Sequence, residues 1–246
     1  MSVSVGDVQG CSGLVIALFA YPHLFNTALA GIAGEAGYEA FQLWARRIYR
    51  HPIFETVLIS SITIHTVAAV YHTYFVVPKK AAAPSSEKND KGAAAPLTTA
   101  QRIKSLHGTT GWILAAFIVG HIYATRFDMP DLRIGWTGNV TATHLLRYWF
   151  VPYYVLLGVA GFFHTFVGIE RSVKRLGPLR NVVRSVLPAS DTVLGRFLLL
   201  SGSLAVAGGV LAFAGFLPWI HVDIKTAISQ PWSQHFIEKV KSFGLL

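Results

Sequence analysis

Five long stretches of apolar residues alternate with shorter polar segments along the chain. They cover residues 10–33, 53–77, 107–125, 148–169 and 193–219. Each is close to the roughly 20 residues that an α-helix needs to cross the hydrocarbon core of a bilayer. The pattern therefore predicts an all-α membrane protein with five transmembrane helices.

The segments around these stretches differ from them in composition. Residues 78–105 form a basic connector rich in Ala and Pro, which we expect inside a five-span membrane domain covering residues 1–220. We expect residues 221–246 to form a short amphipathic C-terminal tail whose apolar face lies at the membrane surface. The predicted organisation is one membrane domain followed by this tail.

The overall composition supports a membrane protein. Hydrophobic residues make up 52% of the chain and charged residues 13%, against about a quarter charged in a globular domain. Such a chain lacks the charged side chains that cover a water-facing surface. In so apolar a chain, the net charge of +9 indicates loops that face anionic lipid, and we expect no nucleic-acid partner. A single cysteine, Cys11, excludes an intramolecular disulfide.

The distribution of basic residues predicts an orientation. With five spans, residues 78–105 and 170–195 lie on the same side as the N-terminus, and together with Arg196, which directly follows the second segment, they hold 12 of the 21 Lys and Arg residues. The positive-inside rule then places the N-terminus in the cytoplasm or the mitochondrial matrix. We expect a multi-pass protein of a mitochondrial membrane or a bacterial inner membrane.

The first and third apolar stretches share a motif. Residues 10–23 and 108–121 both read G-x-[ST]-G-x3-A-x-F-x3-H, at an offset of 98 residues. The second and fourth stretches match around His72 and His164, at an offset of 92. We therefore expect a bundle of two parallel-repeated helix pairs plus a fifth helix without a counterpart.

The histidines that close these motifs are the candidate metal ligands. His23 and His121 lie at one depth of their predicted spans, and His72 and His164 share a second depth nearer the N-terminal side. At 1.5 Å per residue the two levels are roughly 10–15 Å apart. Two imidazoles at each level predict bis-histidine ligation of two haems b. Pairs this far apart cannot close one tetrahedral zinc site.

Alternatives remain open for individual residues. His65 lies seven residues before His72 and could replace it as a ligand. Gln9 and His107 occupy equivalent repeat positions, where each could donate a hydrogen bond to a haem propionate. Arg171, Lys174 and Arg175 follow His164 and either hold propionates or anchor the span among lipid headgroups. A single buried histidine can also be a packing residue that bonds a carbonyl.

With these residues in view, the chain resembles the five-helix diheme cytochrome b subunit of succinate:quinone and quinol:fumarate oxidoreductases. The likeness covers residues 9–215. It includes Gln9, the run to His23, the A-x3-H at His72, the T-G-x9-H ending at His121 and the H-x3-G-x2-R from His164 to Arg171. The resemblance implies that the first helix pairs with the third and the second with the fourth. It also implies that Gln9 and Lys174 lie near propionates.

The resemblance implies a function as well. Such a subunit anchors flavoprotein and iron–sulfur subunits and passes electrons between them and a membrane quinone, either as a non-catalytic or as a quinone-reactive part. No catalytic residue is assigned. A second family with this five-helix domain consists of fungal mitochondrial outer-membrane proteins that act in lipid homeostasis through partner proteins, without a dehydrogenase. A plain helical channel or transporter ranks last, because the spans carry no transport-type carboxylate at mid-depth.

Overall fold

The computed structural model describes residues 3–76, 96–127, 135–176 and 187–244, and all regular structure within these ranges is helical. The long helices are α1 (Val5–Tyr49), α2 (Pro52–Tyr71), α3 (Thr99–Ile122), α5 (Arg147–Leu176) and α7 (Val193–Phe213). The shorter helices are α4 (Trp136–Leu145), α8 (Ile224–Ser229) and α9 (Pro231–Ser242). Two π-helical turns, η1 (His72–Val76) and η2 (Tyr123–Phe127), extend α2 and α3. The predicted all-α class is confirmed.

The start of α1 and its bend follow from local sequence. Ser4 and Asp7 form a capping box that satisfies free N–H groups of the first turn. Gly34 interrupts the helix with φ 61° and ψ −154°, a conformation that favours glycine. Beyond this bend the chain folds back on itself, because Phe25 meets Phe41 and Phe19 meets Tyr49. The first predicted span, residues 10–33, therefore ends at the bend.

Four of the described helical segments are long and apolar enough to cross a membrane: Val5–Tyr49, Pro52–Phe75, Arg147–Leu176 and Val193–Phe213. They cover the first, second, fourth and fifth predicted stretches. Helix α3, at the third stretch, is not among them. Even its most apolar part contains His107, His121 and several Gly and Thr residues. The four segments are compatible with an integral membrane protein.

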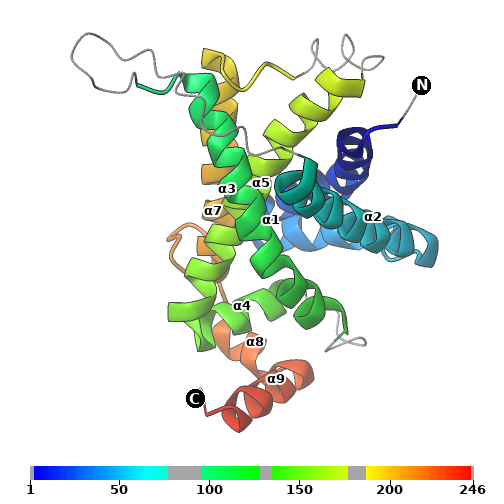
Figure 1. Cartoon of the computed structure of the whole chain (residues 1–246). Coiled ribbons are helices and arrows are strands. Elements are labelled where there is room, and N and C mark those ends of the chain that lie inside the picture. The colour runs from blue at the N-terminus through cyan, green and yellow to red at the C-terminus, as the bar shows by residue number, and fades with distance from the viewer. Residues whose placement is uncertain (1–2, 77–95, 128–134, 177–186, 245–246) are drawn as a thin grey trace.

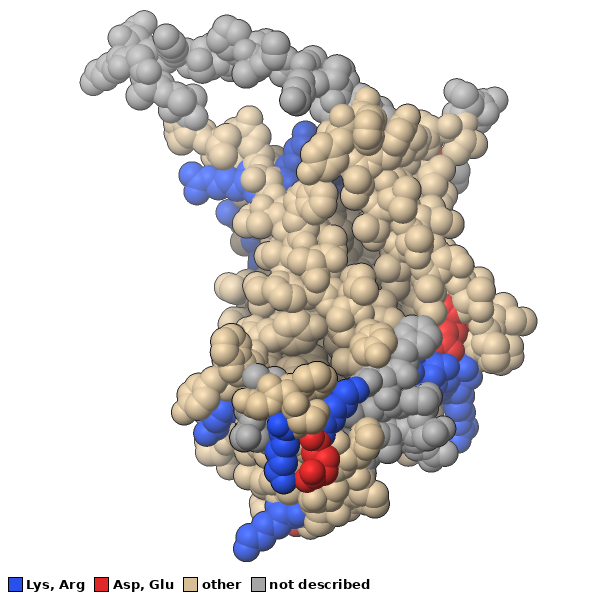
Figure 2. Space-filling view, turned by 60° about the horizontal axis from the view of Figure 1, so that its bottom comes forward, with Lys and Arg blue, Asp and Glu red and all other residues tan. Residues whose placement is uncertain are grey.

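The surface agrees with a bilayer environment. Large apolar side chains are exposed along the long helices, including Leu18 at 71%, Ile32 at 70% and Leu204 at 63%. Water would disfavour so much exposed apolar surface, whereas lipid would cover it. Figure 2 shows Lys and Arg side chains towards two ends of the visible face, with a broad band of other residues between them.

Helices α1, α5 and α7 pack against one another, while α2 packs on α1 and α3 packs on α5 (Figure 1). The N-terminus, the start of α3, the end of α5 and the start of α7 all lie at one end of the molecule. Helices α4, α8 and α9 gather at the opposite end, where the chain also finishes. In this way α1 and α5 form the centre and α2 and α3 the flanks.

The end with the C-terminus has its own apolar core. Trp136 and Val140 of α4 are buried with Tyr38 of α1 and Phe213 of α7. Asp223 caps α8, and its pKa lies below the usual range because its carboxylate accepts hydrogen bonds from the backbone N–H and the hydroxyl of Thr226. This core fixes the position of α4 against the long helices.

The C-terminal tail packs against the bundle through the inner face of α9. Ser233 is fully buried, and its hydroxyl lies 2.9 Å from that of Thr141 on α4. The ring of Phe236 lies 6.2 Å from that of Phe150 on α5. Ser233 and Phe236 of α9 therefore face protein.

Candidate histidine centres

The first centre joins α1 to α3. The imidazoles of His23 and His121 lie with ring centroids 6.1 Å apart and planes inclined by 58°. Phe19, one turn before His23, stacks on its ring at 5.3 Å, and Tyr154 meets the His121 ring edge-on at 6.0 Å. The structure thus brings together the two histidines that the sequence motif pairs.

The second centre joins α2 to α5 and differs from the sequence expectation. His164 faces His65, with ring centroids 6.2 Å apart, and not His72. His72 begins η1, seven residues beyond His65, which is about 10 Å further along a helix. The pairing of His72 with His164 is therefore not what the structure shows, because His72 lies about two helical turns too far along α2.

Both histidines of the second centre are oriented by the main chain. The Nδ1 atom of His65 lies 3.0 Å from the carbonyl oxygen of Gln9, and that of His164 lies 3.1 Å from the carbonyl oxygen of His107. Because a carbonyl oxygen accepts, each Nδ1 must carry the proton and donate. Each Nε2 then keeps a lone pair, which is the form of imidazole that binds metal.

Glycines on the facing helices let these rings approach closely. A Cβ atom at Gly13 would lie 3.1 Å from Cε1 of His65, and one at Gly111 would lie 2.9 Å from Cε1 of His164. Gly13 and Gly111 occupy equivalent positions of the repeated motif, as do Gln9 and His107, whose carbonyl oxygens accept the hydrogen bonds. The same local arrangement therefore occurs twice.

The buried residues of α2 and α5 also repeat, at an offset close to that between the first and third stretches. The three buried residues of α2 are Leu58, Ser61 and Ala68. The residues 99 positions later, Leu157, Ala160 and Val167, are all buried in α5. His65 and His164 are also 99 residues apart, close to the offset of 98 between the first and third stretches. This register, and not the offset of 92, matches the contacts in the structure.

The sequence contains a signal for this register that our motif comparison missed. Leu58 and His65-Thr66 correspond to Leu157 and His164-Thr165, with the same spacing. His72 is also followed by threonine, so a comparison of the histidine and its nearest neighbours does not separate the two registers. The offset of 99 between His65 and His164 is close to the offset of 98 between the first and third stretches. This agreement would have favoured His65, and not His72, as the counterpart of His164.

The predicted propionate partners lie around the second centre. The ring of His107 stacks on that of His164 at 4.2 Å, with planes inclined by 14°. Arg171 is exposed and lies within electrostatic range of both His107 and His164. Lys174 instead forms an ion pair with Glu170 on its own helix. Gln9 contributes its carbonyl oxygen to His65.

The donor sets fit haem. Two imidazoles bound on opposite sides of one iron, at about 2 Å per bond, place their ring centroids about 6 Å apart, as in both centres. In the described parts of the chain, no group of three or more His, Cys, Asp or Glu side chains is arranged to hold a metal ion. Haem needs just two protein donors, since the porphyrin supplies the other four.

The state of the side chains also fits a bound macrocycle. His23 is exposed, and His65, His121 and His164 are half-buried. The Nδ1 atom of His121 is buried without a hydrogen-bond partner among the described residues. The four imidazole rings therefore retain accessible surface that a bound macrocycle could cover, and His121 also has a buried nitrogen without a partner.

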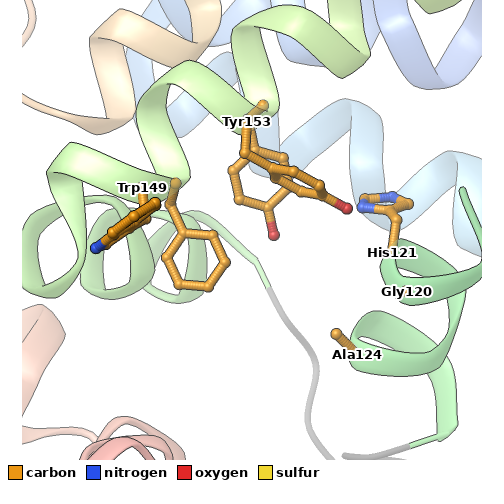
Figure 3. A pocket seen from close by; sticks show the side chains of 7 residues that line it. Gly120, His121, Ala124, Trp149 and Tyr153 are labelled. Carbon is orange, nitrogen blue, oxygen red and sulfur yellow. The ribbon is translucent and has the colours of Figure 1, made fainter. Parts of the chain in front are cut away.

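A pocket of about 280 Å³ adjoins the first centre between α3 and α5 (Figure 3). His121 lies on the α3 side, and Trp149 and Tyr153 extend from α5 on the other side. The full lining comprises Gly120, His121, Ala124, Trp149, Phe150, Tyr153 and Tyr154. This lining suits a flat apolar ring.

Comparisons with known proteins give no independent identification. No family model, no curated protein and no solved structure matches the chain.

Proposed function

We propose that the protein is a diheme b-type cytochrome of a membrane that transfers electrons between its two histidine centres. The observation that supports this proposal most strongly is the equal separation of the two imidazole pairs, 6.1 Å for His23 and His121 and 6.2 Å for His65 and His164. Both values suit bis-imidazole ligation of haem iron, and they arise on four different helices.

We propose His65, in place of His72, as the ligand opposite His164. The support is the matched set of contacts: His65 with Gly13 and the carbonyl oxygen of Gln9, and His164 with Gly111 and that of His107. These contacts also favour two parallel-repeated helix pairs, α1 with α2 and α3 with α5. In this arrangement α3 is the remaining membrane span, and α7 is the fifth helix without a counterpart.

The positions of the two centres suit electron transfer across the bilayer. Gly13, opposite His65, precedes His23 by ten residues on α1, and Gly111, opposite His164, precedes His121 by ten residues on α3. Ten residues of helix correspond to about 15 Å. The two centres thus lie at different depths, with the second nearer the N-terminal end.

The roles of the chain's own residues follow from their contacts. Haem supplies one-electron chemistry when it is bound. The carbonyl oxygens of Gln9 and His107 hold the protons of His65 and His164 on Nδ1, which leaves the lone pair of each Nε2 atom available to iron. Phe19 shields one face of His23. Arg171 provides a cation where a propionate of the second centre would leave the bundle.

We further propose that the electrons pass between a membrane quinone and a flavoprotein with an iron–sulfur partner. The sequence resemblance supports this role, and the aromatic pocket beside His121 offers a place for a quinone ring. The partner subunits would dock at the N-terminal end, where Arg171, Lys174 and Arg175 lie. Arg180 and Arg184, also basic in the sequence, fall outside the described residues.

The second candidate is a haem-binding mitochondrial membrane protein that acts in lipid homeostasis through partner proteins. The resemblance of the chain to that second family of five-helix proteins supports it. Both candidates share the haem centres and differ in the partner.

The decisive experiment is a reduced-minus-oxidised spectrum of the purified protein together with its haem-to-protein ratio. We expect a b-type α-band and a ratio of two. Absence of the band would overturn the proposal, and a ratio of one would leave a single centre. Co-purification of flavin and iron–sulfur subunits in gentle detergent would select the anchor role, and purification without them would select the second candidate.

A further inference from the structure

The carbonyl oxygen that orients His65 also accepts a hydrogen bond from a hydroxyl group. Nδ1 of His65 lies 3.0 Å from the carbonyl oxygen of Gln9, and the hydroxyl oxygen of Ser12 lies 3.1 Å from the same carbonyl oxygen. Ser12 is buried, and its hydroxyl also lies 2.8 Å from the carbonyl oxygen of Val8, so its one proton is shared between two acceptors. The hydroxyl oxygen itself lies 3.5 Å from Nδ1 of His65, so the nearer carbonyl oxygen is the principal acceptor of the imidazole. The Gln9 carbonyl oxygen therefore serves an imidazole of α2 and a hydroxyl of its own helix.

The repeated half of the bundle has the same arrangement. Nδ1 of His164 lies 3.1 Å from the carbonyl oxygen of His107, and the hydroxyl of Thr110 lies 3.1 Å from that carbonyl oxygen. As on α1, the hydroxyl proton is shared with the carbonyl oxygen one residue earlier, here that of Leu106 at 2.9 Å. Ser12 and Thr110 both occupy the [ST] position of the motif G-x-[ST]-G, 98 residues apart. Hydroxyl, carbonyl and imidazole therefore occur together in both halves.

A hydroxyl bond to the preceding turn has no functional meaning by itself. Ser and Thr side chains in helices commonly bond the carbonyl oxygen three or four residues earlier. Thr109 does so with the carbonyl oxygen of Ser105, and among the described residues no imidazole is hydrogen-bonded to that oxygen. What distinguishes Ser12 and Thr110 is an acceptor that also bonds an imidazole from another helix.

Sharing of the acceptor affects how strongly the imidazole can donate to iron. Two donors to one carbonyl oxygen compete for its electron density, so a hydroxyl bond weakens the bond from Nδ1–H. A weaker Nδ1–H···O bond makes the imidazole less basic at Nε2. A less electron-rich axial ligand stabilises ferric iron less, and hydrogen bonding around the ligands is one of the ways in which a protein sets a haem potential. The hydroxyl should therefore raise the midpoint potential.

We infer that the hydroxyls of Ser12 and Thr110 raise the midpoint potential of the haem held by His65 and His164, because they weaken the hydrogen bonds from both imidazoles to the main chain. This inference rests on the proposed haem function. Ser12 and Thr110 are positioning residues, since each acts through a carbonyl oxygen and an imidazole and not by contact with the iron.

The test uses the full-length, haem-loaded protein in lipid bilayers. Thr110→Val removes the hydroxyl and keeps the shape of the side chain, and Thr110→Ser keeps the hydroxyl. Ser12→Ala removes the other hydroxyl, and a variant with Thr110→Val and Ser12→Ala removes both. Thr109→Val is the matched control, because Thr109 is the neighbour of Thr110 and bonds the carbonyl oxygen of Ser105. Redox titration followed at the α-band measures both midpoint potentials, and His121→Ala, which removes the first haem, assigns them.

We expect Thr110→Val and Ser12→Ala each to lower the midpoint potential of the second haem, and the variant with both changes to lower it further. Thr110→Ser and Thr109→Val should leave this potential close to the unmodified value. The first haem should not respond to any of these changes. A second measurement is the NMR signal of the Nδ1 proton of His164 in ¹⁵N-histidine-labelled protein with reduced haems. This signal should move downfield in Thr110→Val, because the hydrogen bond to the carbonyl oxygen becomes stronger, and should stay in place in Thr109→Val.

Two results would overturn the inference. If the potential of the second haem and the Nδ1 proton signal are the same with and without the hydroxyls, the hydroxyls do not act on the imidazoles. If the potential rises when they are removed, they strengthen the imidazole bonds and the proposed direction is wrong. Where Thr110→Val loses the second haem, the Nδ1 proton signal of His164 decides in the same sense. Failure of the proposed function is distinct, because the unmodified protein would then show no α-band while the Nδ1 proton signal would still report on the hydrogen bond.

Discussion

The ring centroids of His65 and His164 lie 6.2 Å apart although these residues are 99 positions apart in the chain. Each ring donates its Nδ1 proton to a main-chain carbonyl on the helix facing it. The acceptor residues, Gln9 and His107, are themselves 98 positions apart. The relationship defines a second imidazole pair that matches the first in separation and suits the same cofactor.

The first prediction concerns the pairing of His23 with His121. Changing either residue to alanine should remove the same haem and lower the haem-to-protein ratio from two to one, because each haem needs both axial ligands. Optical and electron paramagnetic resonance spectra of the two variants should be alike. Loss of different haems in the two variants would contradict the pairing.

The second prediction separates His65 from His72. His65→Ala should remove the same haem as His164→Ala, because these two rings face each other. His72→Ala should keep both haems and serves as the control on the same helix. The haem-to-protein ratio and the low-spin spectrum measure the outcome. A retained ratio of two in His65→Ala, with a loss in His72→Ala, would restore His72 as the ligand.

The third prediction uses the glycine that faces His164. Gly111→Ala adds a Cβ atom 2.9 Å from Cε1 of His164, so the ring must shift. We expect haem affinity at this centre to fall on the order of 10- to 100-fold, as it does when groups that orient a metal-bound histidine are changed. Gly108→Ala is the matched control one turn earlier, since a Cβ there meets nothing within 4 Å. Equal haem retention in both variants would contradict the close approach.

The fourth prediction tests the aromatic pocket. A Cβ atom at Gly120 meets nothing within 4 Å, and Gly120 lines the pocket beside His121. Gly120→Leu should therefore fill the pocket without displacing the helix. We expect both haems to remain and the KM for quinone-dependent reoxidation of the reduced haems to rise, measured by stopped-flow absorbance. Unchanged reoxidation kinetics would place the quinone elsewhere.

The fifth prediction concerns the attachment of the tail. Thr141→Val removes one partner of the buried hydroxyl pair with Ser233 and leaves the other hydroxyl with fewer partners. The cost should be about 0.5–1.5 kcal/mol of local stability, because the Ser233 hydroxyl still donates to the carbonyl oxygen of Ala227. Limited proteolysis should release the segment containing α9 sooner than in the unmodified protein. Thr137→Val, one turn earlier on α4, is the control, and equal rates in both variants would show that the pair contributes little.

The sequence by itself determined the helical class, the apolar segments and one histidine pair. Apolar residues repeat over lengths that suit membrane helices. Capping boxes at Ser4 and Thr98 begin α1 and α3, and α3 starts within the segment 78–105 that we expected to be a connector. The identical spacing from Gly10 to His23 and from Gly108 to His121 placed both histidines at the same depth. These features are local, so the residues themselves specify them.

Tertiary structure decided the remaining features, because they depend on how helices meet. Two histidines on α2, seven residues apart, share one helix face, and packing of α2 on α1 at Gly13 selects His65 to face His164. The bend at Gly34 returns the second half of α1 along the first, so that Tyr49 meets the Phe19 ring that stacks on His23. The repeat in the sequence is compatible with either histidine, because His65 and His72 are both followed by threonine. The packing of whole helices decides between them.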